Sequence, residues 1–349
     1  MKAMKNLTSP ALLAAVFSLF QGVPFAQSST AGTSPFEFLE LRYDARSIAL
    51  GGASTALADD AYGIFSNPAA IAYAASPQAV VGYRSFDGVY GIPLAYIRPE
   101  NDKGVFGIGV CGLTSGNISP TGIDNSGAAV SLGGNAYLDD YSLSLAWARK
   151  IGDFLSAGVT AKAIYELFNE DGAAVQTVDG SENGSTFGIA LDAGCQARFM
   201  NSRLIYGFAL RNLGGVLSGY DKGLPLPVEF AAGVSYVPAS VPVLRLMIDA
   251  DKERDNELTF EPGGEWEIIK NQLFARAGYS FSWSDLQALE DYLSGAGESG
   301  YTRNSMTGFC CGAGLKSAIA GRKVSFDAAV EFLTIAASPN ISLSMLVEM

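Results

Sequence analysis

Period-two alternation of apolar and polar residues fills most of the sequence after residue 77, and it limits the possible folds more than any other feature. Within residues 323–333, Val324 and Phe326 fall on one face while Ser325 and Asp327 fall on the other. Such alternation is typical of β-strands whose two faces meet different surroundings. We count fourteen candidate strands, at residues 78–86, 89–98, 104–114, 137–149, 154–168, 185–199, 203–212, 227–237, 242–251, 256–269, 272–283, 305–317, 322–333 and 340–348.

The lengths of these segments and of their links favour a closed barrel that crosses a membrane. Most segments exceed the ~5–6 residues usual in soluble sheets, and most reach the ~9–11 residues that a tilted strand needs to cross a bilayer. Links after even-numbered segments are brief, whereas four links after odd-numbered segments are long, at residues 115–136, 169–184, 213–226 and 284–304. An even strand number with short turns on one side and long loops on the other is typical of transmembrane barrels. The links after segments one, nine and thirteen are short exceptions.

We therefore predict an all-β fold: a transmembrane antiparallel β-barrel of about 14 strands whose apolar face meets lipid. A soluble periplasmic β-protein is the alternative, because its strands would alternate as well and its apolar faces would form a core. Only 17% of the residues are charged, against about 25% in typical soluble domains, and the mean hydropathy is +0.20. Fourteen apolar faces exceed what one soluble core needs, so the membrane barrel is favoured.

Residues 1–27 have the pattern of an export signal. Lys2 and Lys5 form a charged start, residues 11–20 are apolar, and Ala26 lies near a plausible cleavage point. The apolar part is about half the ~20 residues that a membrane-spanning helix needs, which disfavours a retained anchor. We expect a cleaved signal peptide and localisation in the cell outer membrane.

The sequence contains no histidine. This absence excludes Ser-His-Asp and Cys-His nucleophile pairs and most imidazole-based metal sites. A lysine or carboxylate base is the only enzymatic route left, so we expect no catalytic residue, no metal, no cofactor and no enzyme activity. The four cysteines are scattered, and we interpret them as free rather than as a disulfide framework.

The charge of the exported chain disfavours a nucleic-acid partner. Without Lys2 and Lys5 the chain keeps 21 basic against 35 acidic residues, a net charge of −14. Binding to phosphate backbones needs clustered Lys and Arg, which this sequence lacks.

Residues 49–74 differ from all the alternating segments, because small side chains dominate them. Gly51 and Gly52 predict a tight turn, and residues 55–62 a short helix. Asn67 is a candidate N-cap, with Pro68 at the first helical position, where its missing N–H is harmless. We expect this compact segment to fold back into the barrel lumen. The predicted divisions are a signal peptide at 1–27, an N-terminal segment at 28–77, called the hatch below, and the barrel at 78–349.

The sequence ARSIALGGASTALADDAYGIFSNPAAIA, residues 45–72, resembles the N-terminal motif of the PorV/PorQ family of outer-membrane proteins, which is similar to the FadL long-chain fatty-acid transporters. Residues 208–236, 273–281 and 312–332 fit the same family. The resemblance implies a fourteen-stranded barrel with an N-terminal hatch that blocks the lumen, and it places Asn67, Pro68 and Ala69 in that hatch. The chain departs from many outer-membrane barrels at its end, because Met349 stands where an aromatic residue is common.

Two sets of candidate site residues follow. Asp59 and Asp60 are expected to cap and hydrogen-bond hatch backbone rather than to act as an acid/base pair, because no base or metal ligand accompanies them. The hatch set is Gly51, Gly52, Asp59, Asp60, Asn67, Pro68 and Ala69. Charged residues on the inward strand faces, which also include Lys162, Glu166, Glu229 and Asp249, are expected to pair across strands or hold the hatch, with a ligand path as the alternative. The lumen set is Asp192, Arg211, Arg245, Arg276, Asp327 and Glu331.

Two functions remain open at this point. We favour the passage or binding of hydrophobic, fatty-acid-like small molecules past the hatch, because a hatch inside a lumen controls passage. The alternative is a PorV-type surface component that binds secreted proteins in type IX secretion. The partners expected are thus outer-membrane lipid and either a hydrophobic small molecule or secreted protein substrates.

Overall fold

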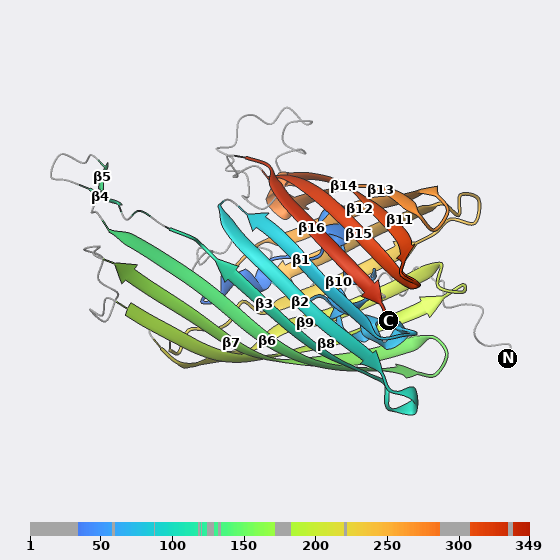
Figure 1. The fold of residues 1–349 in the computed structure, drawn as a ribbon, viewed down its shortest axis with the longest axis horizontal. Coiled ribbons are helices and arrows are strands. Elements are labelled where there is room, and N and C mark those ends of the chain that lie inside the picture. The colour runs from blue at the N-terminus through green and yellow to red at the C-terminus, as the bar shows by residue number, and fades with distance from the viewer. Residues whose placement is uncertain are drawn as a thin grey trace.

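The computed structural model describes residues 34–57, 60–86, 88–117, 119, 121–123, 129–131, 134–171, 183–219, 222–286, 308–333 and 338–349. Fourteen antiparallel strands form a closed barrel, which lies on its side in Figure 1. Each strand pairs with its neighbours in sequence, apart from a hairpin inserted between the third and fourth barrel strands. The first strand closes the barrel against the last, with Gln78 opposite Glu348 and Arg84 opposite Ser342.

The barrel strands are β1 Gln78–Phe86, β2 Val89–Pro99, β3 Val105–Thr114, β6 Asn135–Ile151, β7 Leu155–Asp171, β8 Asn183–Phe199, β9 Leu204–Ser218, β10 Glu229–Tyr236, β11 Leu244–Glu253, β12 Leu258–Ile269, β13 Leu273–Ser282, β14 Gly308–Ile319, β15 Arg322–Leu333 and β16 Asn340–Glu348. The inserted hairpin pairs β4 Thr121–Ile123 with β5 Ala129–Ser131. A short 3-10 turn, η4 Asn101–Lys103, joins β2 to β3.

Each of the fourteen predicted segments coincides with one barrel strand, so the predicted fold is confirmed. The largest difference is in β9, which continues to Ser218 although the prediction ended it at residue 212. The pairing of β8 with β9 shifts register between Leu191 and Ala193, and such a bulge disturbs the alternation that the sequence analysis relied on. The hairpin of β4 and β5 was not predicted.

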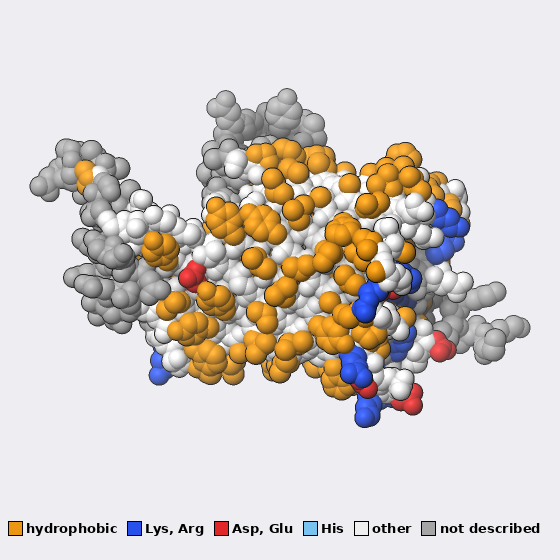
Figure 2. Space-filling view, in the orientation of Figure 1, with side chains coloured by type: hydrophobic (Ala, Val, Ile, Leu, Met, Phe, Trp, Pro, Cys, Tyr) orange, Lys and Arg blue, Asp and Glu red, His pale blue; other side chains and the backbone are white. Residues whose placement is uncertain are grey.

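Alternation along each strand separates an apolar outer surface from a polar lumen. On β6, Leu145 is 57% exposed on the outside, whereas its neighbour Ser144 is fully buried on the inside. Figure 2 shows apolar side chains spread over the face of the barrel in view, with Lys, Arg, Asp and Glu near its ends. This arrangement is the reverse of a soluble β-protein, in which the apolar faces pack together.

The described part of the hatch lies inside the barrel. It contains four short helices: η1 Glu37–Glu40, α2 Ala45–Ile48, η2 Ala61–Ile64 and η3 Pro68–Tyr73. The prediction of a helix over residues 55–62 was wrong, because η2 begins only at Ala61, where Asp60 caps it. Helix α2 was not predicted, because its four residues are too few to show helical periodicity.

Gly51 and Gly52 form the predicted tight turn, but they end α2 instead of preceding a helix. Both have a positive φ, of 79° and 105°, which favours glycine. The N–H of Gly52 donates to the carbonyl of Ser47 and that of Gly51 to Ile48. These bonds satisfy helix carbonyls in the manner of a Schellman cap.

Among the described residues, the helices are all too short or too polar to span a membrane. Residues 1–33 lie outside the described part of the chain, so the signal peptide stays a prediction. All four cysteines are free, as predicted.

Candidate functional site

The turn at Asn67 and Pro68 is where hydrogen bonds hold the hatch against the barrel wall. Asn67 caps η3 by accepting a hydrogen bond from the Ala69 N–H at 3.1 Å. Its side-chain amide donates to the carbonyl of Thr55 at 2.8 Å and to that of Cys195, on β8, at 3.4 Å. Asn67 is fully buried, so each of its polar atoms needs such a partner. The predicted cap is present, and the same side chain also links two parts of the hatch with the wall.

Wall side chains satisfy other backbone carbonyls of the hatch. Ser156 donates to the carbonyl of Ala69 at 3.0 Å, and Gln196 donates to that of Thr55 at 3.1 Å. The hatch has little regular structure, and these bonds replace those that a longer helix would make internally. They hold the hatch in one position against β7 and β8.

Two arginines of the hatch reach charged side chains on the wall. Arg46 makes a bidentate ion pair with Glu265 of β12, with both nitrogen–oxygen distances at 2.8 Å. Arg42 contacts Glu229 of β10 at 2.9 Å and also bonds to Asp251 of β11. Paired charges in a buried lumen tolerate little displacement, since separating them leaves an uncompensated charge. Of these five residues, only Glu229 was expected from the sequence, as one of the inward-facing charges of the strands. The signal for the arginines was their spacing of four positions, with Arg46 inside the quoted motif and Arg42 just before it.

The structure gives each residue of the lumen set a polar partner. Arg211 pairs with Glu229, and Arg276 contacts Glu265 at 2.8 Å and Asp327 at 2.6 Å. These contacts make cross-strand pairs and extend the two networks that bind the hatch arginines.

The remaining members of the lumen set lie in other contacts. The Arg245 guanidinium lies 3.0 Å from the hydroxyl of Ser235. Asp192 accepts from the backbone N–H of Asn212 at 2.8 Å, and Glu331 pairs with Arg84 at 3.0 Å. These contacts agree with the expectation that the lumen set pairs across strands or holds the hatch. A role of the lumen set in a ligand path stays a prediction.

Asp60 occupies the expected capping position, and its carboxylate accepts from the Tyr62 N–H at 2.9 Å. Asp59 lies outside the described residues. Asp44 has a similar role at α2, where its carboxylate accepts from the N–H groups of Arg46 and Ser47. Burial, together with the nearby charge of Asp327, raises the pKa of Asp44 to about 6.

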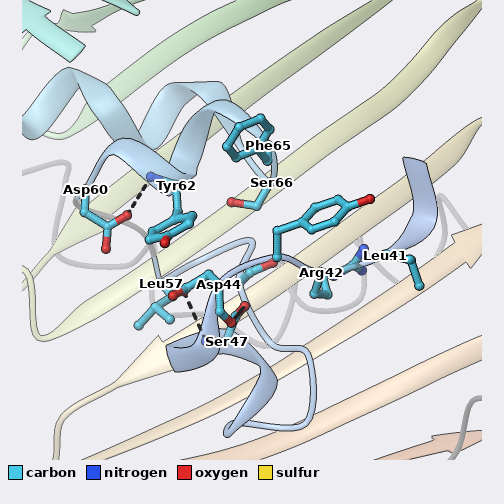
Figure 3. Close-up of a pocket in the computed structure, with 11 residues that line it drawn as sticks. Leu41, Arg42, Asp44, Ser47, Leu57, Asp60, Tyr62, Phe65 and Ser66 are labelled. Carbon is cyan, nitrogen blue, oxygen red and sulfur yellow. Dashed lines mark hydrogen bonds between the residues drawn. The ribbon is translucent and has the colours of Figure 1, made fainter. Parts of the chain in front are cut away.

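A small cavity lies within the hatch, among the side chains drawn in Figure 3. Its volume is about 20 Å³, enough for one water molecule. Arg42, Asp44 and Tyr62 are among its lining residues. A hydrocarbon cannot occupy this space, so passage through this part of the lumen requires the hatch to move.

Comparison with known proteins supports the fold independently of the sequence motif. No family model and no curated protein sequence matches the chain. Among solved structures, the Pseudomonas putida toluene transporter TodX is similar at 12% identity with a TM-score of 0.58, over 87% of this chain and 96% of that one. The chain shares the barrel fold of this transporter.

Two further solved structures have the same fold. The Ralstonia pickettii toluene transporter TbuX has a TM-score of 0.55 at 12% identity, over 86% of this chain and 96% of that one. A Pseudomonas aeruginosa FadL homologue has a TM-score of 0.53 at 10% identity, over 87% of this chain and 97% of its own. The FadL-like barrel predicted from the sequence is thus confirmed at the level of fold, and membership of the PorV/PorQ family stays a prediction.

Proposed function

We propose that this protein lies in the outer membrane and lets hydrophobic small molecules pass through its lumen when the hatch moves. The observation that carries this proposal is a lumen filled by a hatch that is attached to the wall by side-chain contacts. A barrel with an apolar outer surface fits lipid. A filled lumen excludes free diffusion of water-soluble solutes, unlike the open lumen of a porin.

The solved structures of similar fold support the class of ligand. Two of them are toluene transporters and one is a FadL homologue. We extend this to hydrophobic molecules of monoaromatic or fatty-acid type as ligands of this chain. The lack of histidine agrees with a channel rather than an enzyme.

The alternative of a PorV-type component of type IX secretion rests on the motif in residues 45–72 alone. The comparisons do not support it, and no contact among the described residues favours a secreted protein as partner. It stays a hypothesis from the sequence.

An engineered disulfide that reversibly links the hatch to the barrel wall tests the proposal. Ala49 follows α2 and packs with Ala329 of β15 in one buried cluster. The double variant Ala49→Cys/Ala329→Cys should form a disulfide when oxidised, because both side chains are small and lie together. In vesicles that contain the purified protein, we expect uptake of radiolabelled toluene or oleate to fall on oxidation to the level of protein-free vesicles. Reduction should restore it.

The two variants that carry only one of the introduced cysteines, oxidised in the same way, are the controls and should keep wild-type uptake. Labelled glucose should not enter in any state. Equal uptake in the oxidised and reduced double variant would show that the hatch need not move at α2. Failure of the wild-type protein to exceed protein-free vesicles with both ligands would reject the transport function.

A further inference from the structure

A groove runs across the outer surface of the barrel, over β13 to β16 and β1. Its volume is about 560 Å³, within the ~300–1,000 Å³ of small-molecule sites. The large, exposed side chains of Leu315, Phe326 and Leu343 line it. The small side chains of Ala313 and Ala328 lie beside them, directly opposite one another, and leave the space open.

The groove is apolar, because it lies on the face of the strands that meets lipid. Asp327 and Ser344 lie along it in the sequence, but both fall on the inward side of the alternation. Asp327 pairs there with Arg276 at 2.6 Å. A ligand in the groove therefore meets apolar side chains, which suits an acyl chain.

The hairpin that joins β14 to β15 extends beyond the neighbouring strands next to this groove. β13 pairs with β14 as far as Leu315, and β16 pairs with β15 from Val324 onward. Residues 316–323 are all exposed, and Ile319 near the turn is 51% exposed. The hairpin therefore reaches past the strand ends toward the headgroups of the membrane.

This hairpin contains three basic residues and no acidic residue. Lys323 pairs with Glu348 at 3.0 Å. The Lys316 ammonium lies 5.1 Å from the ring centre of Phe274. Neither Lys316 nor Arg322 has an acidic partner among the described residues. Two positive charges thus stay without a counter-charge at one end of the groove.

The end of the barrel with the short turns is basic, although the whole chain has 35 acidic and only 23 basic residues. Figure 2 shows Lys and Arg gathered at the end of the barrel where β16 ends in Figure 1. Within residues 98–104, 149–154, 198–203, 237–243, 267–272, 316–323 and 348–349, the basic residues are Arg98, Lys103, Arg149, Lys150, Arg198, Arg203, Lys270, Lys316, Arg322 and Lys323, and the acidic residues are Glu100, Asp102, Asp153, Glu267 and Glu348. Negative headgroups are therefore attracted to this end.

The spacing between the hairpin charges and the groove suits one lipid molecule. Arg322 and Phe326 both fall on the outward side of β15, four positions or about 13 Å apart, which is roughly 9 Å of depth on a strand tilted by about 45°. The headgroup layer is about 5–8 Å deep on each side of the hydrocarbon core. A phosphate beside Arg322 thus places the acyl chains of its lipid at the level of the groove.

We propose that the groove and this hairpin bind one anionic phospholipid, with its phosphate beside Arg322 and an acyl chain in the groove. Short turns of such barrels lie on the periplasmic side, so the lipid belongs to the periplasmic leaflet. The guanidinium of Arg322 suits a phosphate, and Lys316 adds attraction for a net negative headgroup. The site goes beyond the proposed transport function, because its occupant is a membrane lipid on the outside of the barrel.

A second groove on the outer surface provides a comparison. It runs over β8 to β11, has a volume of about 520 Å³, and is lined by Phe208, Ala232 and Lys252 among others. The ammonium of Lys252 already donates to the backbone carbonyls of Glu253, at 2.7 Å, and of Asn256. Lys252 also lies at the long-loop end of β11. This groove therefore lacks the free basic charges of the first, and we expect no preference for anionic lipid there.

Native mass spectrometry tests the proposal, because it counts the lipids bound to each chain. The purified full-length protein, freed of copurified lipid in a neutral detergent, is titrated with phosphatidylglycerol or with phosphatidylcholine of the same acyl chains. We expect one phosphatidylglycerol per chain, bound at least about tenfold more tightly than phosphatidylcholine, since each basic residue near an anionic headgroup contributes roughly fivefold in affinity.

Variants separate the role of the charges from that of the groove. Lys316→Gln/Arg322→Gln should weaken phosphatidylglycerol binding by roughly tenfold or more and leave phosphatidylcholine binding unchanged. Ala313→Phe fills the groove and should weaken the binding of both lipids. Both sets of positions are exposed on the surface of the barrel, so the fold should persist.

Two matched controls should keep the wild-type affinity for phosphatidylglycerol. Arg149→Gln removes an exposed basic residue at the same end of the barrel, on β6, which does not border the groove. Ala232→Phe fills the second groove instead of the first.

Three results would overturn the assignment. Equal affinity of the wild-type protein for the two lipids would remove the role of the hairpin charges. An equal loss in Arg149→Gln would mean that the basic end attracts lipid as a whole, without a site. A wild-type dimer that Ala313→Phe separates would assign the groove to a second copy of the chain. These measurements do not depend on uptake, so a failed transport assay leaves the lipid site untouched.

Discussion

At the scale of single residues, Asn67 carries several contacts of the hatch at once. Its one side chain caps η3, bridges to Thr55 and reaches the wall at Cys195. Asn67→Ala should lower the free energy of unfolding by about 2–3 kcal/mol, since it removes the cap and leaves the buried Ala69 N–H without its acceptor. Urea titration of the purified protein, followed by tryptophan fluorescence, measures this change.

Ser66→Ala is the control for Asn67. Arg211 binds the backbone carbonyl of Ser66, at 3.0 Å, and that bond survives the change. We expect a loss below about 0.5 kcal/mol, as for substitutions away from such features. An Asn67→Ala variant as stable as Ser66→Ala would show that the capping turn does not stabilise the fold.

The capping carboxylate of Asp44 predicts a pH dependence. Because its pKa is raised to about 6 from an ordinary value of 3.8, the folded protein keeps this proton between pH 4 and 6 while the unfolded chain loses it. The folded state binds more protons in that window, so stability falls as pH rises through it. Asp44→Asn keeps a good cap but cannot ionise.

The midpoint of urea unfolding, measured at pH 4 and pH 7, checks this prediction for Asp44. The wild-type protein should lose stability between the two values, and Asp44→Asn should lose less. Glu331→Gln changes a separate ion pair with Arg84, so this variant should still lose stability between pH 4 and pH 7. Parallel pH profiles of the wild-type and Asp44→Asn proteins would contradict the assignment.

At the scale of elements, the hatch can approach the strands closely because glycines, which have no side chain, lie at the contacts. A β-carbon added to Gly194 on β8 would lie 2.0 Å from Asn67 Oδ1, closer than any contact allows. Gly194→Ala should therefore displace the η3 turn and lower stability by about 1–3 kcal/mol. It should also speed cleavage of the hatch in limited proteolysis.

Gly264→Ala on β12 is the matched control, because the nearest atom to its added β-carbon is Leu246 Cδ2 at 4.0 Å. This variant should keep wild-type stability and wild-type protease resistance. Similar cleavage rates for the variants at Gly194 and Gly264 would mean that the hatch does not depend on contact with β8.

At the scale of the whole molecule, the closed barrel predicts resistance to SDS. All fourteen strands pair on both edges, so no edge is open and unfolding must break the ring of hydrogen bonds. Unboiled samples should migrate differently from boiled ones in SDS gels, and the protein should stay with the membranes after a carbonate wash. Equal mobility, with release into the wash, would support the soluble alternative.

The sequence by itself determined the strand number, the antiparallel order and which face of each strand is apolar. Those features follow from the period-two alternation and from the lengths of the links, which are local in the sequence, and from the requirement that every strand edge be paired. The sequence also predicted the cap at Asn67, because Asn followed by Pro at a helix start is a local signal.

Only the tertiary structure decided how the hatch sits in the lumen. Arg42 meets Glu229 across 187 positions of sequence, and Asp249 binds Ser54 across 195. No periodicity connects residues so far apart, since their meeting depends on barrel closure and on where the hatch turns. Glu229 and Asp251 meet at Arg42 for the same reason: an alternating pattern shows that a side chain points inward, but not which other inward side chains it faces.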